Sequence, residues 1–424
     1  MTVTTFHDAV VPPPAPPPPS AFERITGLDV TRGFAVMGIL AMNIVALAMP
    51  ENAYVTPVAW GGDTGADLFI WAFNYVVFDS KMRGLFSMMF GASTLLVIQS
   101  AVAAGRSPAK NHYGRMIVLA AFGLAHFFLI WFGDILFLYA MCGMLLYAFR
   151  NLSIKALRRW AIGLFVLTML MAGAQFGSLA AGRMAGAPSA LQEVYANIGA
   201  KMAYGSEDQQ EQLELYRSDF PTIVSERFAD DGADPFVNTL IFAPETLALM
   251  LIGMIMFQSG LLRGTWALER LDRWRNWCLG IGIAANLPLL YWQFQSGLDP
   301  TILLLATFWA SIPFDFVMSI GYACLFMGLA QRFAASGFIA RVAAVGRAAF
   351  TNYLGTSILM TALFYGWGLG QFGYWSRIEI YGPVVAIWVI MLLWSKPWLE
   401  HYRYGPLEWL WRSLSRMQMQ PMRK

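Results

Sequence analysis

Residues 28–49 read LDVTRGFAVMGILAMNIVALAM and contain no charged side chain after Arg32. A helix needs roughly 20 apolar residues, within a range of about 17–25, to cross the hydrocarbon core of a bilayer. This stretch meets that length and keeps its two charged residues, Asp29 and Arg32, near one end. It therefore predicts a membrane-spanning helix with the charged pair close to a membrane surface.

Outward from this stretch the same pattern recurs along the chain. Of the 424 residues, 57% are hydrophobic and only 13% are charged, and the mean hydropathy is +0.51. Soluble globular chains carry about 25% charged residues, so much of this surface must face lipid. The predicted fold is all-α, a polytopic transmembrane bundle of about ten spans. The predicted spans are 28–49, 84–103, 116–132, 135–149, 156–176, 238–258, 276–293, 301–330, 348–368 and 381–396.

One apolar segment, at 66–80, is too short to span. Its run LFIWAFNYVVF has eleven residues and includes Asn74. A run of this length is typical of an interfacial or re-entrant helix. We therefore expect a short helix here that does not cross the bilayer.

Positive charge is distributed to one side of the predicted spans, which should be the cytoplasm. Both termini fall on that side, and the largest loop on the other side, 177–237, carries ten acidic and four basic residues. Five segments result: a Pro-rich tail (1–22), an N-terminal bundle (23–176), the extracytoplasmic acidic loop (177–237), a C-terminal bundle (238–414) and a basic tail (415–424). The basic clusters are Arg106/Lys110/Arg115, Arg150/Lys155/Arg158/Arg159, Arg263/Arg270/Arg273/Arg275, Arg332/Arg341/Arg347 and Lys396/Arg403/Arg412.

Motifs of soluble enzymes are missing from the sequence: it has no P-loop, no HExxH and no CxxC. The three cysteines, Cys142, Cys278 and Cys324, stand inside apolar runs and form no metal-ligand pattern. The net charge of +3 is too small and too scattered for a nucleic-acid partner. We expect membrane lipids as partners, and no metal site.

Ionisable groups inside spans are costly and mark functional candidates. His126, in LAAFGLAHFFLIWFGD, is deep in a predicted span, where it either packs between helices or serves as a general base. Asp134 follows Gly133 in a tight turn, where it either caps the next helix or serves the site. It stands about two helical turns along the chain from His126, so direct contact is not expected. Glu245, beside the kinking Pro244, is expected to orient His126 instead.

Three further groups suit substrate binding. Lys81 and Arg83 are expected at the outer interface, as anchors or as ligands of an anionic substrate. Asp315, after Pro313, is expected near the bilayer centre, where it either links helices or forms part of a pathway. At the inner helix ends, Asp29 and Arg32 share a helix face, and with Arg347 they form either a structural ion pair or an anion site.

Five motifs resemble successive signatures of one family, the YeiB-type family catalogued as domain of unknown function 418. They are GLDVTRGFAVMGILAMN, KMRGLFSMMFGA, FGLAHFFLIWFGDILFLYAMCGMLL, VGRAAFTNYLGTSI and YGPLEWLWRSL, and they run from about residue 24 to 414. The resemblance implies a bacterial inner-membrane protein, and members of this family largely lack an established activity.

The first motif also resembles transmembrane acyltransferases such as the lysosomal heparan-glucosaminide acetyltransferase. That resemblance implies an acyl donor, such as acyl-CoA, bound from the cytoplasm, and a glycan or lipid acceptor on the other face. Many relatives have histidine eleven residues after the motif arginine, where this chain has Asn43. The implied catalytic set is then His126 as base, Asp134 or Glu245 as its partner, and Asn43 as oxyanion donor. The implied donor site is Asp29, Arg32, Arg115, Arg347 and Asn352.

Two other functions fit the sequence. Pro-kinked helices bearing Glu245 and Asp315 also suit a transporter or lipid-handling protein. A non-catalytic scaffold, forming a homo-oligomer or joining a larger membrane complex through its tail or acidic loop, is the third interpretation.

Overall fold

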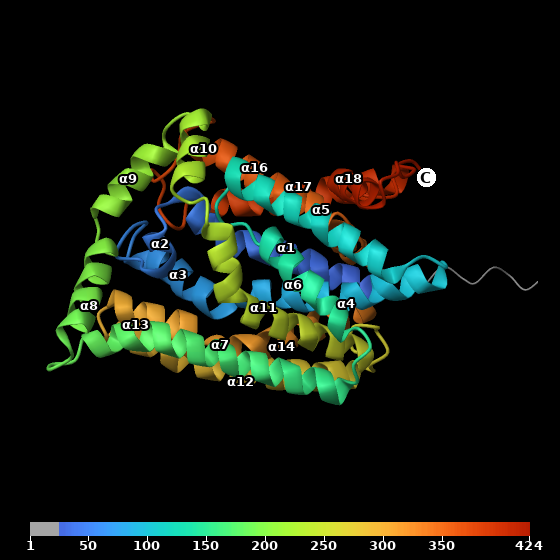
Figure 1. The fold of residues 1–424 in the computed structure, drawn as a ribbon, viewed down its shortest axis with the longest axis horizontal. Helices are drawn as coiled ribbons and strands as arrows, with labels where there is room; N and C mark the ends of the chain where they lie inside the picture. Colours follow the sequence, from blue (N-terminus) through green and yellow to red (C-terminus); the bar gives the residue numbers. More distant parts are fainter. Residues whose placement is uncertain (1–24) are drawn as a thin grey trace, which may run out of the picture.

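The computed structural model describes residues 25–424, and its regular structure is helical (Figure 1). The expected Pro-rich tail at 1–22 lies outside the described residues. The helices are α1 (Thr26–Ala48), α2 (Asn52–Val55), α3 (Gly65–Val77), α4 (Lys81–Ala103), α5 (Pro108–Leu129), α6 (Leu136–Leu146), η1 (Tyr147–Phe149), α7 (Ile154–Gly182), α8 (Ser189–Lys201), α9 (Glu207–Tyr216), α10 (Phe220–Ala229), α11 (Asp234–Gln258), α12 (Leu268–Gln295), α13 (Pro300–Leu305), η2 (Ala306–Ala310), α14 (Ile312–Arg332), α15 (Gly337–Arg347), α16 (Ala349–Phe364), α17 (Tyr381–His401) and α18 (Pro406–Arg416).

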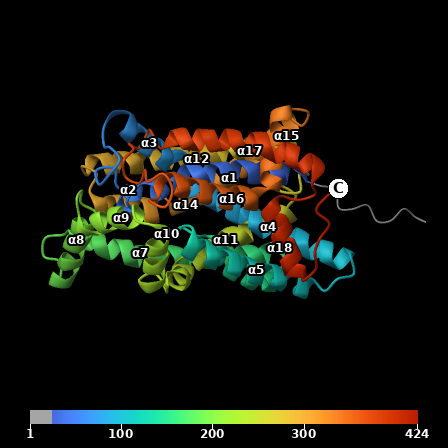
Figure 2. The same cartoon turned by 90° about the horizontal axis from the view of Figure 1, so that it is seen from above.

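The long helices run roughly side by side, and the segment α8–α10 covers one end of the bundle (Figures 1 and 2). We call this the loop end. The opposite end, where α1 and α5 begin and α18 lies, is called the basic end. Helix α1 is the most buried of the long helices and packs against α4, α14, α15, α16 and α17. Helices α7 and α12 form an outer layer on α11 and α14.

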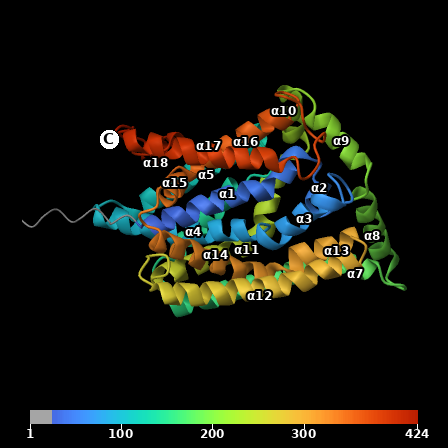
Figure 3. The ribbon, with the colours of Figure 1, turned by 180° about the vertical axis from the view of Figure 1, so that it is seen from behind.

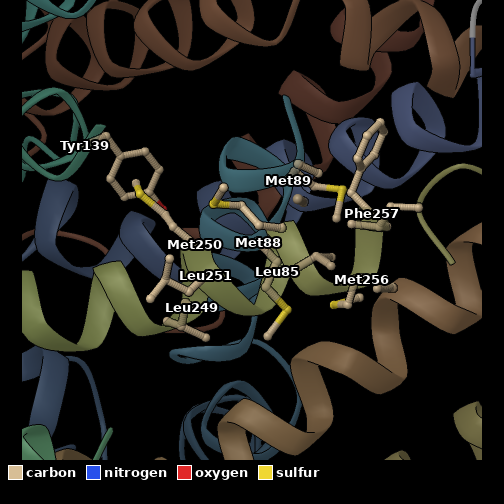
Figure 4. Close-up of a cluster of buried hydrophobic side chains, with 14 of the residues drawn as sticks. Leu85, Met88, Met89, Tyr139, Leu249, Met250, Leu251, Met256 and Phe257 are labelled. Carbon is tan, nitrogen blue, oxygen red and sulfur yellow. The ribbon is translucent and has the colours of Figure 1, made fainter. Parts of the chain in front are cut away.

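The core of the bundle is a close crossing of α4 and α11. Gly91 of α4 lies against the backbone of Met250, and Gly253 of α11 lies against the backbone of Met88. Small residues at such a crossing let two helix backbones approach, as is common in membrane bundles. Figure 4 shows the methionine and leucine side chains of the two helices around this contact.

Replacing Gly253 by alanine should destabilise the protein by about 1–3 kcal/mol, because the new methyl group would meet the Met88 backbone, which cannot move aside. Gly163→Ala is the matched control, since no atom lies within 4 Å of the place that its new methyl group would take. Thermal unfolding of both variants in detergent measures the effect. Equal melting temperatures for the two variants would contradict this account of the crossing.

Seven segments are long and apolar enough to cross a membrane, within residues 25–424. They coincide with seven of the ten predicted spans, so the chain is a multi-pass membrane protein. The other three predicted spans are helices of a different kind: 135–149 is α6 with η1 and 348–368 contains α16, and both are short. The third, 276–293, lies in the 28-residue α12, which does not reach the apolarity of the seven.

The short segment at 66–80 is the first part of a broken helix. Helix α3 has only 13 residues, roughly 20 Å at 1.5 Å per residue, and cannot cross alone. After a bend at residues 78–80, where Ser80 has a φ of 57°, α4 continues toward the basic end (Figure 3). The structure joins α3 to α4 in one of the seven segments of membrane length, and an interfacial or re-entrant position of α3 stays a prediction.

Candidate functional site

His126 and Asp134 form a buried pair where α5 ends and α6 begins. The distance between His126 Nδ1 and Asp134 Oδ1 is 2.8 Å, and both side chains are at most 2% exposed. The other carboxylate oxygen accepts the Phe137 N–H at 2.8 Å and thereby caps α6. Because Nδ1 is engaged by the carboxylate, Nε2 is the ring nitrogen left to react, and it has no hydrogen-bond partner among the described residues. A general base and the carboxylate that orients it require such a geometry, with one ring nitrogen held and the other available.

This contact corrects the expectation that Asp134 is too far along the chain to reach His126. Helix α5 ends at Leu129, and the chain reverses before α6, so Asp134 folds back onto the preceding turn. The expected partner Glu245 forms an ion pair with Arg83 instead, with a distance of 2.7 Å between Glu245 Oε1 and Arg83 Nη2.

Lys81 and Asp315 form a second ion pair, at the interruptions of two helices. Lys81 Nζ lies 2.8 Å from Asp315 Oδ1 and donates to the carbonyl of Tyr75, near the end of α3. Asp315 follows the π-helical segment η2 and accepts from Ser311. Lys81 is only 1% exposed, so it is not the exposed anchor that one of the two interpretations expected. The three expected substrate-binding residues are therefore engaged in ion pairs inside the protein.

Asp315→Asn should destabilise the protein by about 3–5 kcal/mol, because it leaves the Lys81 charge buried without its partner. The double variant Lys81→Met/Asp315→Leu removes both charges at once and should recover most of that loss. Unfolding temperatures of the purified variants test this. An Asp315→Asn protein as stable as the wild type would show that the pair is dispensable.

A cavity of about 360 Å³ lies at the basic end. Five arginines line it, and we call it the arginine pocket: Arg32 of α1, Arg115 of α5, Arg347 of α15, Arg403 after α17, and Arg412 of α18. Arginine presents several N–H donors in a fixed plane and suits phosphate and carboxylate groups. The sequence positions span nearly the whole chain, so only the fold brings these cations together.

Three of the five residues expected at a donor site line this pocket: Arg32, Arg115 and Arg347. Asp29 does not line it but pairs with Arg32 at 3.2 Å. Asn352 is buried outside it, where its amide donates to the Val345 carbonyl and accepts from the Trp394 indole.

Helix α18 supplies one wall of the pocket, which the sequence analysis did not anticipate. Trp411 donates from its indole to the Arg115 carbonyl, and the Arg115 guanidinium stacks over the Trp411 ring at 4.2 Å. Glu408 accepts the backbone N–H groups of Phe350 and Thr351 at the start of α16. Burial raises the pKa of the Glu408 carboxyl. The alternation of tryptophan, leucine and charge in PLEWLWRSL was the available signal for an amphipathic wall helix.

A smaller cavity of about 130 Å³ adjoins the arginine pocket and shares Arg32, Phe86, Phe90, Arg347, Glu408 and Trp411 with it. We call this the inner pocket. Its remaining lining residues are Leu119, Ile135, Leu136, Tyr139, Gly346, Ala349, Phe350 and Tyr353.

The inner pocket extends toward His126 without including it. The Tyr353 ring, which lines the pocket, lies 5.4 Å from the His126 ring, and Ile135 directly follows Asp134. Asn43 lines a third void of about 10 Å³, also beside Tyr353. A void of that size holds about one water molecule. The structure thus brings His126 and Asp134 together, places the donor-site arginines at one end, and leaves Tyr353 between the two regions.

Comparison with known proteins places the chain. A family model described as "protein of unknown function (DUF418)" matches residues 256–418. The uncharacterized protein YeiB of Escherichia coli K12 is 32% identical over 93% of this chain and 96% of its own length. The chain belongs to the DUF418 family. The uncharacterized protein YxaH of Bacillus subtilis 168 is 29% identical over 95% of this chain and 96% of YxaH. No solved structure matches the chain.

The expected YeiB-type resemblance is therefore confirmed. The residues matched by the DUF418 model contain Tyr353 and the pocket residues Arg347, Arg403, Glu408 and Arg412, whereas His126, Asp134, Arg32 and Arg115 precede them. Both halves of this DUF418 chain are needed to build the candidate site. Within the described range 25–424, no group of three or more His, Cys, Asp or Glu side chains is placed to hold a metal ion.

Proposed function

We propose that this DUF418 protein is a membrane acyltransferase that moves an acyl group from a cytoplasmic donor to an acceptor on the opposite face. The observation that carries the proposal is the buried His126, with Nδ1 on Asp134 and Nε2 without a partner among the described residues. A histidine that only packed would normally satisfy both ring nitrogens, because an unpaired buried polar atom costs free energy. A general base needs one nitrogen free and the other held.

The arginine pocket supports an anionic donor entering from the basic end, which we assign to the cytoplasm. Glu408 is the one carboxylate among the residues that line it, and two backbone N–H groups and the Thr351 hydroxyl already donate to it. The five guanidinium groups therefore outnumber the carboxylates of the pocket and suit several phosphate oxygens. Acyl-CoA fits this chemistry and is the donor suggested by the resemblance to transmembrane acyltransferases.

The distance between the two regions also favours a donor with a long arm. His126 lies eleven residues beyond Arg115 on α5, roughly 16 Å along the helix axis. A donor whose phosphates bind the arginines must carry its reactive carbonyl at the end of an extended chain. The inner pocket, lined mostly by apolar side chains, lies along this route.

In this arrangement the acyl group passes directly from the donor to the acceptor. His126 Nε2 takes the proton from an acceptor hydroxyl or amine, and the acceptor atom attacks the acyl carbonyl carbon. The C–S bond to the donor then breaks, and His126 returns the proton to the departing thiolate. Asp134 holds the ring and stabilises its charged form between these steps. The acceptor is an envelope glycan or lipid that approaches from the loop end.

A transporter is the second candidate, favoured by one observation. The interruptions of α3–α4 and α13–α14 meet at the buried Lys81–Asp315 pair, and broken helices with charged groups form the binding sites of many transporters. The three cavities described above do not include either residue. We therefore rank acyl transfer first.

Release of free CoA from acetyl-CoA by the purified protein in lipid nanodiscs tests the proposal. With an extract of envelope glycans and lipids as acceptor, we expect the thiol to appear at a rate that depends on protein concentration. The label from radiolabelled acetyl-CoA should appear in one acceptor class. If the protein does not accelerate thiol release with any acceptor fraction, acyl transfer is contradicted and transport becomes the better explanation.

A further inference from the structure

Tyr353 occupies the position between the donor cavities and His126. It lies on the first turns of α16, is 6% exposed, and lines both the inner pocket and the void beside Asn43. Its ring lies 5.4 Å from the His126 ring, with 54° between the ring planes. A reactive carbonyl that travels along the inner pocket toward His126 must therefore pass next to this side chain.

The two tyrosines that line the inner pocket, Tyr139 and Tyr353, differ in the contacts of their hydroxyl groups. Tyr139 lies 2.6 Å from the Ser87 hydroxyl and donates to the Arg83 carbonyl at 3.2 Å. The Tyr353 hydroxyl is buried beside the Ile135 backbone N–H and donates to no acceptor among residues 25–424. Since a buried donor without an acceptor costs free energy, this hydroxyl is suited to an acceptor that a ligand brings.

Asn43 is less well placed for the same task. The implied oxyanion donor lines only the void of about 10 Å³ and does not line the inner pocket. Tyr353, in contrast, lines both that void and the inner pocket. An acyl carbonyl in the inner pocket would meet Tyr353 before it met Asn43.

We propose that Tyr353 is a catalytic residue whose O–H donates a hydrogen bond to the acyl carbonyl oxygen. This inference rests on the proposed acyl transfer. As the acceptor attacks, the C=O bond becomes a C–O⁻ single bond, and the Tyr353 hydrogen bond strengthens as that charge develops. The phenol keeps its proton throughout, and the C=O bond re-forms when the C–S bond breaks. His126 carries the only proton that moves between the acceptor and the leaving thiolate.

Tyr353→Phe tests this role, because it removes the hydroxyl and keeps the ring that packs on His126. Acetyl-CoA is the probe, free CoA is the product, and the protein is the full chain in nanodiscs. We expect kcat to fall about 10²-fold, as when one oxyanion donor is removed, while KM for acetyl-CoA and the affinity for CoA stay unchanged. The melting temperature should fall by less than in the control, since the lost hydroxyl donates to no acceptor among the described residues and has only the Ile135 backbone N–H beside it.

Tyr322→Phe is the matched control, a buried tyrosine that lines none of the three cavities and whose hydroxyl donates to the Val77 carbonyl at 2.9 Å. Its kcat should stay near the wild-type value, although the lost hydrogen bond should lower its melting temperature. If Tyr353→Phe turns over like the wild type while His126→Ala does not, the role of Tyr353 is overturned and acyl transfer stands. If the wild type shows no His126-dependent release of CoA, the proposed function fails and this role fails with it.

Discussion

Replacing His126 by alanine is expected to lower the rate of CoA release by about 10²- to 10⁴-fold, the usual contribution of a general base. The acceptor would then have no nearby group to take its proton, because Nε2 is removed while Asp134 remains bound to the α6 N-terminus. Binding of CoA should not change, since His126 does not line the arginine pocket. Turnover and CoA affinity measured on one preparation separate these two effects.

The Asp134→Asn substitution tests the same pair with a side chain of nearly the same size. The asparagine oxygen can still accept the Phe137 N–H, so the cap of α6 survives. Its amide would then face Nδ1 and place the ring proton on Nε2, which removes the base. Turnover should fall about as far as in His126→Ala. An Asp134→Asn protein with normal turnover would show that the pair is structural.

The second large effect is expected at the arginine pocket. Arg412→Ala should weaken acetyl-CoA binding by about 10- to 100-fold, the cost of a lost hydrogen bond to a charged group. Arg115→Lys should also weaken it, because lysine keeps the charge and loses the planar pair of donors. Affinity of the wild type should fall as salt rises, since phosphate contacts are screened.

Arg270→Ala is the control for that series. Arg270 stacks over the Trp266 ring near the start of α12 and does not line the pocket. Its removal should leave acetyl-CoA affinity at the wild-type value. Equal losses in Arg270→Ala and Arg412→Ala would mean that binding responds to the general positive charge of this end and involves no specific pocket.

Much of the architecture could be predicted because span length is a property of contiguous sequence. Seven predicted spans coincide with apolar helices of membrane length. The interruption between α3 and α4 was missed because a helix that continues after a bend looks like two separate runs in sequence. Only the buried Lys81–Asp315 pair, made across distant segments, shows why charge is tolerated at that bend.

The candidate site was predictable in its residue types and less so in its partners. His126 was identified because a histidine deep in a span is rare. The prediction for its partner was wrong because it placed Asp134 by distance along a continuous helix. The chain instead reverses between α5 and α6 and brings Asp134 back to His126, which lies eight residues earlier in the sequence. Glu245 pairs with Arg83 instead. These two residues are 162 positions apart in the sequence, and no local pattern indicates their contact. Tyr353 carried no signal at all, since an aromatic residue inside a span usually packs.

A structure of the protein in nanodiscs with a non-hydrolysable acetyl-CoA analogue would show directly whether the arginine pocket is the donor site. We expect the analogue's phosphates to contact Arg115, Arg347 and Arg412, and its arm to follow the inner pocket. Its carbonyl oxygen should lie within hydrogen-bond distance of the Tyr353 hydroxyl, with the carbonyl carbon next to His126 Nε2. An analogue bound elsewhere, or an arginine pocket empty at saturating concentration, would contradict acyl transfer at this site.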